Sequence, residues 1–188
     1  MLQAEMSLFK NKELSSFTNR MLNSFLNVMV VDRTSGDVAR WKTLRDKGWV
    51  GMTESERKEW LGEINARPTA TRGMFTHNDL NRIETAIELL SLRLNRLGYM
   101  DSTVEVKRDW SYKDDIWIDD MGRILNNVQM LRQSITVYPT TPKVPTINRK
   151  LDYTVVNDIE QILIDLDDII SKYIQSRHYV GETYCGEV

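Results

Sequence analysis

The fold is decided by residues 76–98, which read THNDLNRIETAIELLSLRLNRLG. Their apolar residues alternate at spacings of three and four, so they form one stripe along an α-helix, and that stripe must be buried. Thr76 and Asp79 form a capping-box pattern at the start, and Gly98 suits the left-handed conformation that ends many helices. These signals predict a long central helix. Its stripe consists of Leu80, Ile83, Ile87, Leu90, Leu94 and Leu97.

Two further stretches, residues 114–135 and residues 154–175, have the same three-four spacing and predict two more long helices. The apolar face of the last helix is broad, which suits burial between two neighbours. Between these stretches, prolines at positions 139, 142 and 145 forbid helix and favour extended backbone. They predict a stiff crossover that lies over the bundle. Residues 104–110 are expected to be a loop or one short strand.

Two short charged helices are predicted before the central helix, within residues 37–64. Thr34 with Asp37 and Thr53 with Glu56 are capping pairs at their starts, and Gly48 is the expected stop of the first. Their few bulky apolar residues include tryptophans. We therefore predict a helical hairpin on the surface, held by tryptophans.

Residues 1–31 carry helix-spaced apolar side chains, and a helix of this length needs a packing partner. It is either the first helix of the same core or a protruding arm for oligomerisation, and residues 28–31 could instead form a short strand. The candidate docking residues in this segment are Phe17, Met21 and Phe25.

Residues 179–188, YVGETYCGEV, repeat Gly-Glu five positions apart. Alternating β-forming residues with glycines are typical of a small strand, or of an extended tail that adds to another sheet edge. The candidate docking residues here are Tyr179, Gly181, Glu182, Tyr184, Gly186 and Glu187.

Together these patterns predict a mainly α-helical protein with three long helices and a short helical hairpin, in which minor β structure could form at the C-terminal tail. The predicted divisions are an arm or first helix at 1–31, a bundle domain at 32–178 and an extended tail at 179–188. A chain of 188 residues can bury a sizeable core without disulfide bonds or structural metal ions.

Composition argues against several partners and compartments. With 25 basic and 27 acidic residues the net charge is -2, so nothing indicates bulk attraction to nucleic acid or to an anionic membrane. The single Cys185 allows no internal disulfide and fits a reducing cytosol. No secretory signal or membrane-spanning apolar run is recognised, so a soluble chain made in the cytoplasm is expected.

No familiar pattern for catalysis, cofactor binding or metal binding occurs. Glycine-rich phosphate loops and the GxSxG nucleophile motif are missing, and Cys185 with His77 and His178 lacks zinc-ligand spacing. Asp165, Asp167 and Asp168 are interpreted as a solvated acidic face. We predict no enzyme activity, no cofactor and no metal.

A short internal repeat is also visible. Asn81-Arg82-Ile83-Glu84 and Asn157-Asp158-Ile159-Glu160 both read Asn-x-Ile-Glu, and similar apolar residues follow each. Chance can produce such a match in helices built on one stripe. A structural duplication is the alternative, and it would place the two copies in similar surroundings.

From Asp32 to Val188 the chain carries, in order, the motifs DRTSGDV, LRDKGW, MTESERKEWL, THNDLNRIE, LNRLGY, PTTPKVP, DYTVVNDIEQIL and GETYCGEV. In this order they resemble a family of small proteins or domains encoded with the structural genes of tailed phages and prophages of Gram-positive bacteria. The resemblance implies a virion component near the tail, baseplate or fibre, without a known catalytic role. Residues 61–75 replace a shorter glycine-containing connection of that family, and residues 1–31 lie outside the resemblance.

The expected function is that of a virion structural protein that docks to other virion proteins and forms a homo-oligomer. Its expected location is the virion. Two alternatives stay open: a cytosolic helical adaptor or regulatory protein, and an enzyme with a metal site on the acidic helix.

Overall fold

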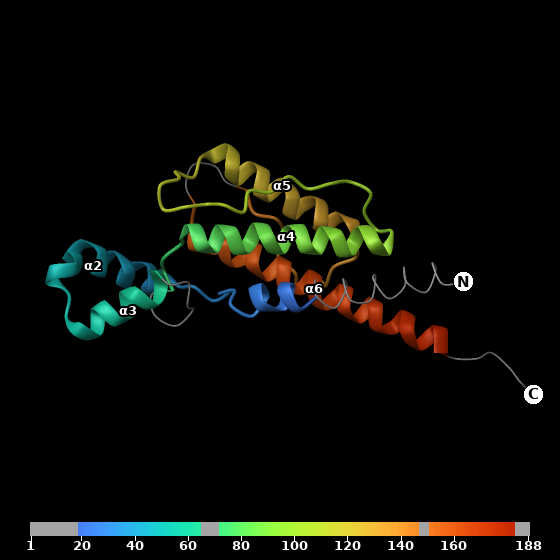
Figure 1. Cartoon of the computed structure of the whole chain (residues 1–188), viewed down its shortest axis with the longest axis horizontal. Helices are drawn as coiled ribbons and strands as arrows, with labels where there is room; N and C mark the ends of the chain where they lie inside the picture. The colour runs from blue at the N-terminus through green and yellow to red at the C-terminus, as the bar shows by residue number, and fades with distance from the viewer. Residues whose placement is uncertain (1–18, 65–71, 147–150, 183–188) are drawn as a thin grey trace, which may run out of the picture.

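The structure is a computed structural model that describes residues 19–64, 72–146 and 151–182. In these residues the chain is mainly α-helical, as predicted, and contains no strand. Three long helices form a bundle: α4 (His77–Leu97), α5 (Ile118–Ser134) and α6 (Tyr153–Glu182). Each of the three packs against the other two, and the helical hairpin extends from one end of this body (Figure 1).

Helix α4 begins and ends where its sequence predicts. The Thr76 hydroxyl accepts the Asp79 amide, while the Asp79 carboxylate accepts the Thr76 amide at 2.8 Å, so two amides that the helix start leaves free are satisfied. At the other end Gly98 has φ 77°, and the Tyr99 amide donates to the Leu94 carbonyl at 3.0 Å. The predicted stripe lies in the bundle core, where all its residues are buried except Leu97, which is partly buried.

Helix α5 starts four residues later than predicted because Asp114 has another role. Its carboxylate accepts the Ser111 amide at 2.7 Å, and its own amide donates to the Ser111 carbonyl, which closes a turn. Helix α5 then begins at Ile118, with Asp120 accepting the amide of Trp117. Its buried stripe includes Met121, Ile124, Val128 and Leu131.

The proline-containing crossover lies over the bundle, as predicted. Pro142 accepts a hydrogen bond from Arg132 Nε of α5 at 2.9 Å. On α6, Asp165 accepts the Thr141 hydroxyl at 2.6 Å and Asp168 accepts the Tyr138 hydroxyl at 2.7 Å. Residues 104–110 are a loop, and residues 28–31 form no strand.

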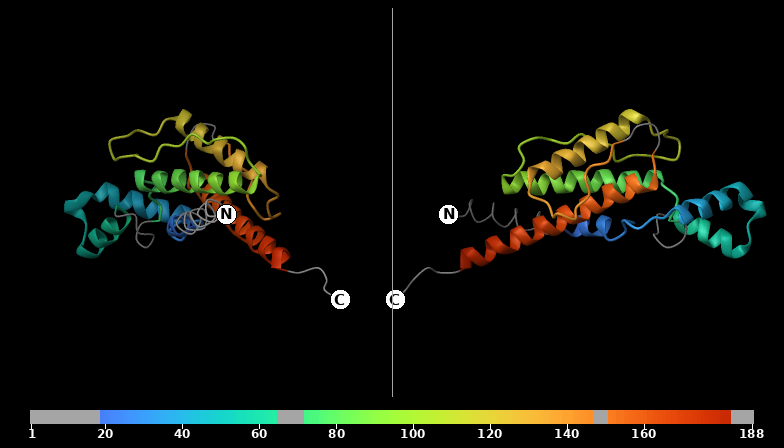
Figure 2. Two further views of the ribbon diagram at one scale, coloured as in Figure 1. Left: turned by 45° about the vertical axis from the view of Figure 1, so that its right-hand side comes forward. Right: turned by 180° about the vertical axis from the view of Figure 1, so that it is seen from behind.

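The expectation of an extended tail from residue 179 is wrong for residues 179–182, because α6 continues through Glu182. No proline interrupts this stretch, and Gly181 costs only about 1 kcal/mol in a helix interior and less at an end. The C-terminal part of α6 runs beyond α4 (Figure 2). Residues 183–188 lie outside the described residues.

Residues 19–26 are helical, and two of their leucines, Leu22 and Leu26, belong to the bundle core. Met21 and Phe25 are partly buried against the same core. The described part of the N-terminal segment is therefore a helix of the core and not a protruding arm.

Candidate functional site

The predicted docking residues do not form one described surface. Met21 and Phe25 pack on the body of their own chain. Tyr179, Gly181 and Glu182 lie in the helical end of α6, where an extended tail was expected. Phe17, Tyr184, Gly186 and Glu187 fall outside the described residues.

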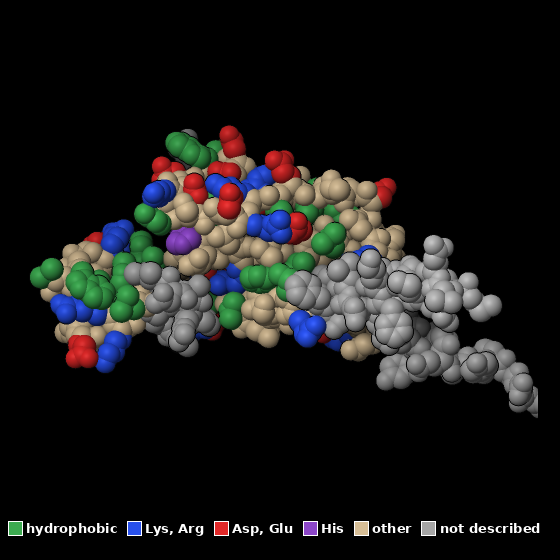
Figure 3. All heavy atoms as spheres, viewed as in Figure 1, with side chains coloured by type: hydrophobic (Ala, Val, Ile, Leu, Met, Phe, Trp, Pro, Cys, Tyr) green, Lys and Arg blue, Asp and Glu red, His purple; other side chains and the backbone are tan. Residues whose placement is uncertain are grey.

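Exposed hydrophobic side chains gather instead on the hairpin of α2 (Ser35–Gly51) and α3 (Glu54–Ile64). Trp49 is 50% exposed and Val50 is 90% exposed at the turn between the helices. Figure 3 shows hydrophobic side chains collected over this hairpin, with basic side chains around them. We call Trp49 and Val50 the hairpin tip. Sequence reasoning missed it because tryptophan is usually a packing residue.

The tip is set by a backbone turn and an arginine. Gly48 has φ 62°, a conformation that favours glycine, so the helix is interrupted just before Trp49. Arg57 Nε donates to the Trp49 carbonyl at 3.0 Å, and its guanidinium lies over the Trp49 ring at 5.4 Å. The buried hydrophobic side chains of the described hairpin are Leu44 and Met52, so the prediction that tryptophans hold it is wrong for Trp49.

Capping and ion pairs join the two hairpin helices. The Glu56 carboxylate accepts the Thr53 amide at 2.9 Å and pairs with Lys47 Nζ of α2 at 2.7 Å. The Lys47 hydrogen bond, followed by the Thr53 amide, lowers the pKa of Glu56 to about 2. Arg40 of α2 pairs with Glu59 of α3 at 2.9 Å.

A second apolar surface lies between the start of α4 and the loop before α5. It is a shallow groove of about 400 Å³, and Trp117, next to it in the chain, is 69% exposed. Asp114 supplies a carboxylate to its lining. The hydrophobic side chains of the lining include Phe75, Leu80, Trp110, Tyr112 and Ile116.

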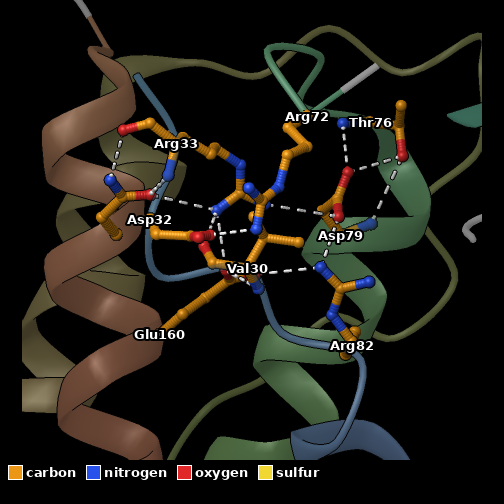
Figure 4. Close-up of polar contacts among 9 residues, drawn as sticks. Val30, Asp32, Arg33, Arg72, Thr76, Asp79, Arg82 and Glu160 are labelled. Carbon is orange, nitrogen blue, oxygen red and sulfur yellow. Dashed lines mark hydrogen bonds and ion pairs between the residues drawn. The ribbon is translucent and has the colours of Figure 1, made fainter. Parts of the chain in front are cut away.

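The root of the hairpin is held by a buried cluster of charges (Figure 4). Glu160 of α6 is fully buried, and its Oε2 accepts the Val30 amide at 2.8 Å and Arg33 Nη1 at 2.7 Å. Its Oε1 accepts Arg82 Nη2 of α4 at 2.9 Å. Arg82 also pairs with Asp79 at 2.5 Å. We call Arg33, Asp79, Arg82 and Glu160 the root cluster.

The root cluster is electrically neutral, with two guanidinium groups and two carboxylates. Burial opposes the charge of Arg82, but Asp79 and Glu160 outweigh that effect and raise the pKa of Arg82. Removing one partner of such a buried pair would leave an uncompensated charge, which is why these pairs are hard to break. Segment 30–33, α4 and α6 are thus tied at one point.

Two further contacts hold the root. Asp32 forms an ion pair with Arg72, so the chain entering the hairpin is tied to the chain leaving it. Gly73 lies against α2 so closely that an added Cβ would overlap the backbone of Asp37 and Val38. These contacts hold the start of α2 against the chain that leads into α4.

The three aspartates that the sequence places close together on α6 have separate partners. Asp165 accepts the Thr141 hydroxyl, Asp167 pairs with Arg93, and Asp168 pairs with Lys172 at 2.7 Å. Over the described ranges no group of three or more His, Cys, Asp or Glu side chains is arranged to hold a metal.

Comparisons with known proteins return nothing: no family model, no curated protein and no solved structure matches the chain. In the part of the chain that the structure describes, no helix is both long and apolar enough to cross a bilayer.

Proposed function

We propose that the protein is a structural component of a tailed-phage particle, in its tail, baseplate or fibre region, and that it acts by docking. The phage part of the proposal rests on the motifs between Asp32 and Val188, which in their order along the chain resemble proteins encoded with the structural genes of tailed phages. The observation that carries the docking role is the hairpin tip, where Trp49 and Val50 are exposed at the far end of a hairpin whose root is fixed. Exposed aromatic and aliphatic groups on a rigid support are typical of contact surfaces.

A second copy of the chain is the proposed occupant of the tip. Exposed ion pairs of both signs flank it, Arg45 with Asp46 and Lys58 with Glu54. A surface that carries both signs can meet its own copy about a two-fold axis, because each charge then finds its opposite across the contact. Homo-oligomerisation through the tip would leave other surfaces for neighbouring virion proteins.

Mass spectrometry of purified particles tests the location. The protein should be present at a constant ratio to the major tail proteins after repeated purification. If the protein remains with host cytosol and is absent from particles, it is a cytosolic adaptor or regulator and the proposal fails.

Light scattering after size exclusion tests the docking. The full chain should be oligomeric, and Val50→Glu should shift it toward the monomer. Leu92→Glu is the matched control, because Leu92 is an exposed leucine on α4, away from the tip. Equal oligomer mass for wild type and Val50→Glu would contradict the proposal that the chain oligomerises through the hairpin tip.

A further inference from the structure

The repeated Asn-x-Ile-Glu pattern corresponds to two sites of the same design. Glu84 on α4 and Glu160 on α6 are both fully buried, although they directly follow stripe isoleucines and belong to surface-forming residue types. Each lies beneath an extended segment of the chain: segment 107–110 at α4 and segment 30–33 at α6. The surroundings of the two copies can therefore be compared atom by atom.

At α4, Asn81 binds both backbone groups of Trp110. Its Oδ1 accepts the Trp110 amide at 2.8 Å, and its Nδ2 donates to the Trp110 carbonyl at 2.9 Å. Glu84 Oε2 accepts the amide of Lys107 at 2.7 Å, and Oε1 accepts Trp110 Nε1 at 2.8 Å. Asn81 and Glu84 thus bind the first and the fourth residue of segment 107–110.

At α6 the same contacts recur. Asn157 Oδ1 accepts the Arg33 amide at 3.2 Å, and Nδ2 donates to the Arg33 carbonyl at 2.9 Å. Glu160 Oε2 accepts the amide of Val30 at 2.8 Å, three residues before Arg33, and also accepts Arg33 Nη1 at 2.7 Å. Arg33 therefore stands where Trp110 stands in the first site.

A neighbouring helix completes each site with an arginine. Arg123 of α5 donates to Glu84 at 2.8 Å, and Arg82 of α4 donates to Glu160 at 2.9 Å. Both arginines stand three residues after the aspartate of a helix start, Asp79 or Asp120, and pair with it. Arg82 and Arg123 thus occupy the same position relative to the starts of their helices, and each donates to the buried glutamate of a neighbouring helix.

We propose that α4 and α6 carry two copies of one binding site for an extended peptide segment. The site takes a segment with backbone N–H groups at its first and fourth residues and a side-chain N–H donor at the fourth. The donor gives one oxygen of the buried carboxylate, Oε2 of Glu160 or Oε1 of Glu84, a further hydrogen bond, which offsets part of the cost of burying its charge. In this chain the ligands are its own segments, 107–110 and 30–33.

The two donors differ in charge, and the α6 site balances the charge of Arg33. Arg33 brings a positive charge that Trp110 does not, and the α6 site alone has the carboxylate of Asp79 within 3.9 Å of that guanidinium. With Arg33 and Arg82 against Glu160 and Asp79, the filled α6 site is neutral. The two fourth residues, Trp110 and Arg33, thus share a side-chain N–H group and differ in charge.

Amide exchange in the unaltered full chain tests the shared design. The amides of Val30, Arg33, Lys107 and Trp110 should exchange at least about tenfold more slowly than those of the two residues between each pair, because the first and fourth residues are bound. Uniform exchange along either segment would overturn the proposal.

Substitution of Arg33 tests the donor requirement. Arg33→Trp and Arg33→Phe remove the same charge and introduce aromatic rings, but only tryptophan offers an N–H group, as Trp110 does. The Arg33→Trp chain should have the higher urea midpoint and retain slow exchange at Val30. Equal urea midpoints, or a higher midpoint for Arg33→Phe, would refute the proposal that the site takes a side-chain N–H donor at the fourth residue.

Discussion

The bundle and the hairpin are stabilised in different ways. The bundle encloses a continuous apolar core with contributions from residues 19–26, α4, α5 and α6, and it buries ionised groups as ion pairs. The hairpin buries Leu44 and Met52 and relies on capping residues and on ion pairs near solvent. Burial contributes more free energy than exposed ion pairs, so the hairpin should open more readily than the bundle.

The largest expected loss follows from Glu160→Ala. It leaves Arg33 and Arg82 buried with only Asp79 to balance them, so the free energy of unfolding should fall by about 3–5 kcal/mol. Urea denaturation followed by circular dichroism measures this. Glu88→Ala is the control, because Glu88 pairs with the exposed Arg108, and such a pair contributes about 0–1 kcal/mol. Similar losses in both variants would contradict the role of burial.

A pair of leucines separates the two regions directly. Leu90 and Leu44 are both fully buried, the first in the bundle and the second in the hairpin. Leu90→Ala should lower the unfolding free energy of the whole chain by about 2–5 kcal/mol through the cavity it leaves. Leu44→Ala should raise amide exchange within α2 and α3 while the bundle amides stay protected. If Leu44→Ala exposes the bundle amides as well, the two regions unfold as one unit.

Gly73→Ala tests the contact at the root of the hairpin, where the chain leading into α4 lies against α2. The new methyl group would overlap the backbone of α2, and overpacking of this kind typically costs about 1–3 kcal/mol. Exchange at segment 30–33 and at the start of α2 should increase. Gly122→Ala is the control, since an added Cβ at Gly122 of α5 meets open space. Wild-type exchange in Gly73→Ala would show that the root can shift freely.

The smallest effect concerns Glu56 and pH. Its folded-state pKa of about 2 lies below the ordinary value of 4.5, so its contribution to stability is present above pH 4.5 and is lost as the pH falls toward 2. The difference in hairpin stability between wild type and Glu56→Gln should therefore be largest near neutral pH and vanish near pH 2. Amide exchange of α3 at several pH values, corrected for intrinsic rates, measures it. A pH-independent difference would show that the ionised form of Glu56 does not stabilise the hairpin.

The helical body could be predicted because its signals are local. The capping pairs at Thr76, Thr34 and Thr53 and the stop at Gly98 occur as expected. Helix α5 was predicted to start too early because Asp114 serves equally well in a turn. The extended tail was predicted to begin too early, at residue 179, because a glycine near the end of a helix is tolerated.

The polar sites could not be predicted because their partners are distant in sequence. Arg33 and Glu160 lie 127 residues apart, and nothing in the residues around Glu160 indicates that an extended segment covers it. The repeated Asn-x-Ile-Glu was the available signal, and it indicated similar surroundings without showing that both glutamates are buried. The hairpin tip was missed for the opposite reason, since Trp49 was expected to be packed.

The ion pair between Asp32 and Arg72 has a practical consequence for protein engineering. It places the two ends of the hairpin module beside each other, so the chain leaves the bundle at Asp32 and returns at Arg72 as one excursion with a closed base. Such an excursion can be cut out and replaced by a short linker, or exchanged for a foreign sequence, without stretching the remaining chain. The bundle would then serve as a carrier for grafted peptides.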